Sequence, residues 1–141
     1  MTKQKIASIL LYIVSLGIVG FGVIYIYKGY TVGLMPYHFQ FLGVESCDQL
    51  DPKVSELMKT FVHIIGFAFT AIGVTFFLLV KGMFNGEQDD YDWKIIAAMI
   101  LVLVPIIYEM INLASYTPWK IVTGLLVIAA IALFLSRSRT H

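Results

Sequence analysis

Apolar residues gather into four long stretches along the chain, separated by shorter polar segments. The stretches cover residues 6–27, 57–80, 95–114 and 119–135. A helix needs about 20 mainly apolar residues to cross the hydrocarbon core of a bilayer, within a range of about 17–25. The pattern therefore predicts four transmembrane helices.

Two prolines mark predicted helix starts, because Asp51 precedes Pro52 and Thr117 precedes Pro118. An Asp or Thr side chain caps free backbone N–H groups, and proline suits the first helical position, where no N–H is needed. Residues 115–117 alone separate the third and fourth stretches, so these two helices are predicted to be antiparallel neighbours. Close helix packing is expected at six glycines, because they have no side chain: Gly17, Gly20, Gly22, Gly66, Gly73 and Gly124.

Composition places these helices in a membrane. Hydrophobic residues make up 59% of the chain and charged residues 13%, whereas soluble domains carry about 25% charged residues. This low charge argues against a soluble enzyme, and the net charge of +1 argues against a nucleic-acid binder. The expected fold is all-α: an antiparallel four-helix transmembrane bundle, with residues 1–141 forming one integral membrane domain.

Positive residues near the span ends predict the orientation, because cytoplasmic ends carry an excess of Lys and Arg. Four spans place both termini on one side, together with the loop 82–92. That side has six such residues and the other has four, so both termini are predicted to be cytoplasmic. The first stretch is longer than a signal-peptide core and has no small-residue cleavage site, so a retained span is expected.

The loop at residues 28–51 is predicted to be a structured outer element. It either folds over the outer end of the bundle or lies in the headgroup region. Cys47, the single cysteine, is interpreted as an inert, partly buried thiol, with an intermolecular disulfide as the alternative. The prediction depends on bulky apolar side chains that would be unfavourable in water: Tyr30, Leu34, Met35, Tyr37, Phe39, Phe41 and Leu42.

Two ionisable residues within the spans, His63 and Glu109, form the main candidate site. Ionisable side chains are costly in a membrane and need a partner or a function. Counted along their helices, both lie roughly 8–9 Å below the outer boundary. An imidazole that faces a carboxylate relieves the desolvation cost of both groups. Such a pair is either a structural link or part of a ligand site, and the third alternative is that the two residues do not meet.

Further candidates gather near the same depth. Tyr108 adjoins Glu109, and Asn112 follows it by three residues. His38 joins the site if the outer loop folds inward. Pro105 removes one backbone hydrogen bond of its helix and favours a widening below Glu109. We expect no metal and no cofactor, because a His/His/Glu set here has no recognised ligand spacing.

Three short segments carry a family resemblance: MPYHF at 35–39, LG at 42–43 and TPW at 117–119. They are similar to motifs of DoxX-like small four-helix membrane proteins of bacteria, many of them uncharacterised. The resemblance implies a bacterial inner membrane and a large first outer loop. It implies no particular chemistry.

Two functions agree with this pattern. The favoured interpretation is an accessory or scaffold subunit, which docks its lipid-facing surface on a larger membrane complex or on a second copy. It depends on the excess of apolar and small residues and on the lack of a complete catalytic set. The alternative is a bundle that binds or transforms a lipid- or quinone-like ligand at an outer-leaflet site. That site would be built on His63 and Glu109, with His38, Tyr108 and Asn112 lining it.

Overall fold

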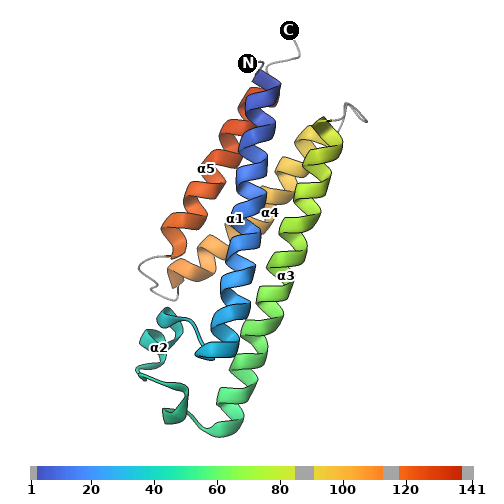
Figure 1. The fold of residues 1–141 in the computed structure, drawn as a ribbon. Helices are drawn as coiled ribbons and strands as arrows, with labels where there is room; N and C mark the ends of the chain where they lie inside the picture. The colour runs from blue at the N-terminus through green and yellow to red at the C-terminus, as the bar shows by residue number, and fades with distance from the viewer. Residues whose placement is uncertain (1–2, 85–90, 113–117, 138–141) are drawn as a thin grey trace.

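The structure, a computed structural model, describes residues 3–84, 91–112 and 118–137, which are helical apart from short connections (Figure 1). The predicted all-α fold is confirmed for this part of the chain. Each predicted apolar stretch lies in one long helix, except residues 113 and 114, which lie outside the described residues. The elements are α1 (Lys3–Thr31), α2 (Pro36–Leu42), the 3-10 helix η1 (Cys47–Gln49), α3 (Pro52–Phe84), α4 (Tyr91–Asn112) and α5 (Pro118–Arg137).

The long helices form an antiparallel arrangement with α1 in the middle. α1 packs against α3 on one side and against α5 on the other (Figure 1). α4 runs obliquely behind α1, packs against α5 and meets α3 over a short stretch only. α2 and η1 lie at the opposite end of the bundle from the start of α1, beside the last turns of α1 and the first turns of α3.

The start of α3 agrees with the sequence. The Oδ1 atom of Asp51 accepts a hydrogen bond from the backbone N–H of Lys53 at 2.9 Å, and Pro52 is the first helical residue. This carboxylate satisfies a backbone donor that the helix itself leaves free. α5 begins at Pro118 as predicted, whereas Thr117 lies outside the described residues.

A seam of small residues joins α1 to α3. Ser8, Ser15, Gly22 and Gly29 follow one another at intervals of seven residues on α1, and all four are buried. A seven-residue repeat keeps one face of a helix against its partner along a left-handed crossing. The hydroxyl of Ser15 donates to the backbone carbonyl of Leu11 at 2.9 Å, so this polar group is satisfied inside its own helix. Ser15 is therefore buried in the seam with its hydroxyl satisfied by α1 itself.

Glycines bring the two backbones close in this seam. A Cβ atom added to Gly22 would lie 2.5 Å from the backbone nitrogen of Thr70, and one added to Gly73 would lie 2.7 Å from that of Val19. Gly66 is similarly close to α1, and Gly17 instead faces Leu125 of α5. The prediction of close packing is thus confirmed for four glycines. It is wrong for Gly20 and Gly124, where a Cβ would meet nothing within 4 Å among the described residues.

The remaining packing falls into two apolar cores. One core joins the four long helices, and the other lies beneath the α2 segment. The first contains Leu11, Val14, Ile18, Phe76, Val80, Met99, Leu103, Met110, Val122, Leu125, Ala129 and Ala132. The second contains Tyr25, Leu34, Met35, Tyr37, Cys47 and Val62. The loop after α1 is therefore a structured element that folds onto the bundle.

Two helical segments are long and apolar enough to cross a membrane: Lys5–Thr31 and Pro52–Gly82. In the most apolar 18-residue part of each segment, only 33% of the residues in α1 and 22% of those in α3 are buried. Most of these apolar residues therefore face outward. Shorter apolar helical segments cover Ala97–Asn112 and Trp119–Ala132. Their outward residues include Leu101 and Phe134, which are 74% and 77% exposed.

Candidate functional site

His63 lies on α3 and packs against α1. Its ring stacks on Tyr30 with ring centroids 4.1 Å apart, and it fills the space beside the missing side chain of Gly29. The Nε2 atom is buried and has no hydrogen-bond partner among the described residues. A buried polar atom without a partner is costly, so His63 is an energetically strained part of the seam.

No described contact joins His63 to Tyr108, Asn112 or His38. Tyr108 is 64% exposed on the outer face of α4, and Asn112 is also exposed. Glu109 belongs to α4, but its side chain lies outside the described residues, so its pairing with His63 stays a prediction. Of the four candidates whose side chains are described, His38 lines a cleft, whereas His63, Tyr108 and Asn112 are not among its lining residues.

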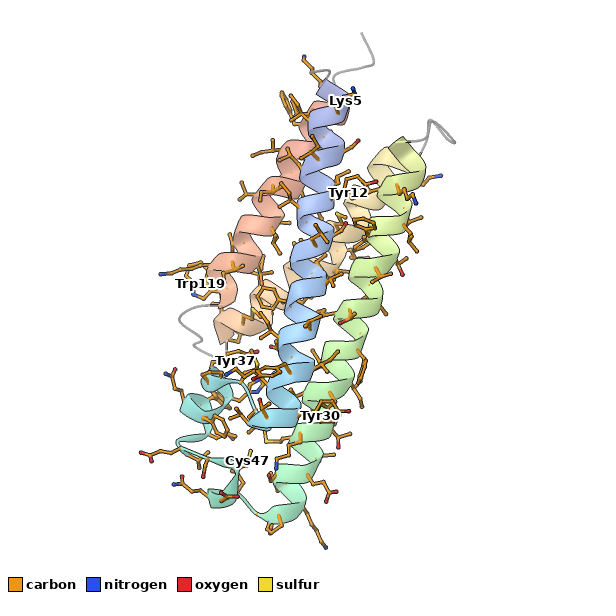
Figure 2. The ribbon with its side chains drawn as sticks, viewed as in Figure 1. Lys5, Tyr12, Tyr30, Tyr37, Cys47 and Trp119 are labelled. Atoms are coloured by element: carbon orange, nitrogen blue, oxygen red, sulfur yellow. The ribbon has the colours of Figure 1, made fainter. Side chains whose placement is uncertain are left out.

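This cleft of about 270 Å³ is bounded by α2 and three of the long helices. It lies where the oblique path of α4 leaves α3, so the two helices do not close against each other. Figure 2 shows Tyr37 at this place, between the α2 segment and the lower half of α1. The lining residues are Tyr25 from α1, Tyr37 and His38 from α2, Ile65 and Phe69 from α3, and Pro105, Ile106 and Met110 from α4.

The cleft opens toward the outward apolar surface of the bundle. Ile65 is 38% exposed, and Pro105 is also exposed, yet both line the cleft. Pro105 cannot donate the usual backbone hydrogen bond to the residue four positions earlier, which loosens the helix at this point. A widening at Pro105 was predicted below Glu109, and Pro105 does line a cleft. The described residues that share this cleft include His38 and two tyrosines.

The local sequence explains why α2 stays over the cleft. Pro36 occupies the first turn of α2, and Gly43 ends the helix with a left-handed backbone at φ 67°. Leu34, Met35 and Tyr37 are buried against the bundle. A proline start and a glycine stop confine the helix to a short segment, and the buried side chains dock it.

A hydrogen bond of Cys47 also holds the loop that follows α2. The thiol of Cys47 is buried and donates to the backbone carbonyl of Val32 at 3.4 Å. It lies beside Gly33, whose backbone is left-handed at φ 93°. Burial of this thiol was predicted and is confirmed, whereas its inertness stays a prediction.

His38 has a defined hydrogen-bonding state. Its Nδ1 atom accepts a hydrogen bond from the backbone N–H of Met35 at 3.3 Å. A neutral imidazole that accepts at Nδ1 carries its proton on Nε2. Burial lowers the pKa of His38 below its usual 6.5, and a hydrogen bond to the neutral form acts in the same direction. His38 is thus a neutral side chain with one N–H to donate.

The cleft contains no charged residue among its lining residues, and no group of three or more His, Cys, Asp or Glu side chains that could hold a metal occurs in the described ranges. It is an apolar and aromatic space with three polar side chains: Tyr25, Tyr37 and His38. Sequence reasoning missed the two tyrosines as site residues, although Tyr37 lies in the segment that carries the family resemblance.

Comparisons with known proteins find no match to a family model, to a curated protein or to a solved structure.

Proposed function

We propose that this protein crosses a membrane with four helices and binds one end of a lipophilic molecule in the cleft beneath α2. The proposal of four spans is supported by the outward apolar residues of all four long helices, of which Leu101 on α4 and Phe134 on α5 are the most exposed. Contiguous apolar surface of this extent is unfavourable in water and favourable in hydrocarbon. The shorter apolar parts of α4 and α5 would cross beside α1 and α3, which supply the longer spans.

The cleft carries the ligand-binding part of the proposal. Its volume of about 270 Å³ is just below the roughly 300–1,000 Å³ of small-molecule pockets. It therefore suits the end of a long molecule better than a whole compact ligand. Its opening beside Ile65 and Pro105 faces the surface that we assign to lipid, so a ligand would enter sideways from the bilayer.

This proposal keeps the lipophilic ligand class predicted from the sequence but moves its site. The ligand end lies against His38 and α4, whereas His63 belongs to the α1–α3 seam. A role in chemistry is not part of the proposal, because the described lining residues offer hydrogen-bonding groups but no nucleophile with a base beside it.

Labelling of single cysteines from the two sides of the membrane tests the four spans. In a Cys47→Ala background, Lys5→Cys and Lys81→Cys would react from the cytoplasmic side of sealed vesicles, and Glu45→Cys and Lys120→Cys from the other side. Lys120 decides between four and two spans, because it would react together with Lys81 if α4 and α5 did not cross. All four native residues are exposed, so the reagent can reach each position.

A cleft-filling substitution tests ligand binding. Ile106→Trp would occupy the cleft, and Leu101→Trp, on the outward face of the same helix, is its matched control. The probe is a photoreactive long-chain methyl ester, cross-linked to the protein purified in mild detergent. Ile106→Trp is expected to abolish cross-linking to α2 and α4, and Leu101→Trp to preserve it. Equal cross-linking in both variants contradicts binding in the cleft.

An accessory role is the second candidate, favoured by the low burial of α3. Only 22% of the residues in the most apolar 18-residue part of α3 are buried within this chain. A long face of this helix is therefore left for lipid or for another subunit. Purification in mild detergent decides the matter. A protein recovered in fixed proportion would support docking, and recovery of the chain with lipid alone would contradict it.

A further inference from the structure

The described residues that line the cleft combine polar groups with no charged side chain. Five of the eight lining residues are apolar, and the other three are Tyr25, Tyr37 and His38. None of these three carries a charge when His38 is neutral. An ionic ligand group would have no opposite charge to meet among the lining residues, and burying an unpaired ion is costly.

The proton on His38 makes this side chain a donor toward any ligand. Nδ1 is occupied by the Met35 N–H, so the ring has no free acceptor atom. Nε2 forms no hydrogen bond with any residue in the described part of the chain. Its N–H group is therefore available, and a ligand atom that approaches it must be an acceptor.

The two tyrosines complete a polar corner within the apolar cleft. Tyr25 is buried on α1, and Tyr37 is buried on α2 with its ring edge-on to His38 at a centroid distance of 4.4 Å. Neither hydroxyl forms a hydrogen bond with another described residue. Neither hydroxyl is among the buried side-chain atoms that lack a partner in the described ranges, so both reach accessible space, where a ligand or water can form a hydrogen bond with them.

We propose that the cleft selects an uncharged head group with a hydrogen-bond acceptor, such as the carbonyl of an ester, ketone or quinone, and that His38 donates to it through Nε2. This inference rests on the proposed function, because it specifies the ligand of the same cleft. Carboxylate and ammonium heads are disfavoured, the first by the lack of a cation and the second by the N–H group that it would face. The apolar tail of the ligand lies along Ile65, Phe69 and Ile106 toward the lipid surface.

Four photoreactive probes with the same alkyl chain test the selectivity. Their heads are a methyl ester, a carboxylate, an ammonium group and a plain methyl group, and apparent affinity is measured by cross-linking of the detergent-purified chain at pH 7. We expect the ester to bind about three- to tenfold more tightly than the methyl probe, which corresponds to one neutral hydrogen bond. Both charged probes should bind more weakly than the ester.

Two variants separate donation to the ligand from the structural role of His38. Asn places an oxygen near the position of Nδ1 and keeps the bond to Met35, but it lacks a donor at the position of Nε2. Gln places an amide N–H near Nε2 but loses the geometry of Nδ1. His38→Asn should bring the ester down to the affinity of the methyl probe, whereas His38→Gln should keep the ester preference. The reverse order would show that His38 only holds α2 in place.

The outcomes distinguish the two proposals. If no probe cross-links to the cleft, or if Ile106→Trp leaves cross-linking unchanged, the proposed function fails. If all four probes bind the cleft equally, or if a charged probe binds best, the cleft is a lipid site but its selectivity for a neutral acceptor is wrong.

Discussion

The α1–α3 seam and the cleft beneath α2 differ in how closely the neighbouring helices approach each other. In the seam, Gly22, Gly66 and Gly73 let two backbones approach until no side chain fits between them. At the cleft, α4 diverges from α3 and the intervening volume is left for α2 and for open space. The seam forms because its glycines have no side chains, whereas the cleft forms because α4 runs away from α3. The difference predicts that substitutions in the seam affect folding, whereas those at the cleft affect binding.

The largest effect is expected from Gly22→Val. The new side chain would meet backbone atoms of Thr70 and Gly66, which cannot rotate away. We expect a loss of about 3 kcal/mol or more in the free energy of unfolding, at the upper end of overpacking effects. Thermal unfolding in detergent measures it. Gly20→Val on the same helix meets nothing within 4 Å among the described residues, so it should change stability by no more than about 0.5 kcal/mol. Similar losses in both variants would contradict the assignment of the seam.

A smaller effect is expected at Gly33, in the segment that joins the seam to α2. An alanine at φ 93° is strained, and its Cβ would lie 2.8 Å from the Sγ atom of Cys47. We expect Gly33→Ala to cost about 2 kcal/mol and to speed labelling of Cys47 by maleimide. Gly43→Ala is the matched control, because φ there is 67° but the surrounding space is open. Equal labelling rates in the two variants would show that Gly33 does not hold the thiol in place.

Much of the fold could be predicted from the sequence, because each long helix carries its own apolar stretch and Asp51 and Pro52 mark a helix start locally. The site could not be predicted as well. The membrane depth of His63 stays a prediction, and depth along a helix does not say which way a side chain points. Gly66 and Thr70 follow His63 by three and seven residues, so they lie on the same face of α3, and this face packs against α1. The cleft depends on the oblique path of α4 and on the docking of α2, which no local pattern encodes.

His63→Phe tests whether this residue is structural. Phenylalanine keeps a ring to stack on Tyr30 and removes the buried Nε2 atom that has no partner in the described part of the chain. We expect the free energy of unfolding to rise by about 1 kcal/mol, because an unsatisfied polar atom is lost. A double-mutant cycle with Glu109→Gln examines the predicted pair. Additive effects of the two substitutions would show that the two residues do not interact. A loss of stability in His63→Phe, together with a strong coupling energy, would support the predicted pair and contradict a purely structural role of His63.

The smallest effect is the pH dependence that His38 contributes to stability. Burial lowers its pKa in the folded protein below 6.5, so below that pH the unfolded chain binds more protons than the folded chain. The contribution of His38 is therefore fully present above about pH 6.5 and is lost as the pH falls toward the lower, folded-state pKa. His38→Asn cannot titrate and keeps an acceptor for the Met35 N–H, so its stability should fall less between pH 7 and pH 5 than that of the parent chain.

Protonation would also turn Nδ1 from an acceptor into a donor facing the Met35 N–H, so α2 should loosen before the seam does. Maleimide labelling of Cys47, which lies under the same segment, should accelerate at pH 5 relative to the intrinsic thiol rate in the parent but not in His38→Asn. Parallel behaviour of the two proteins would mean that acid acts elsewhere and that α2 is held by its apolar side chains alone.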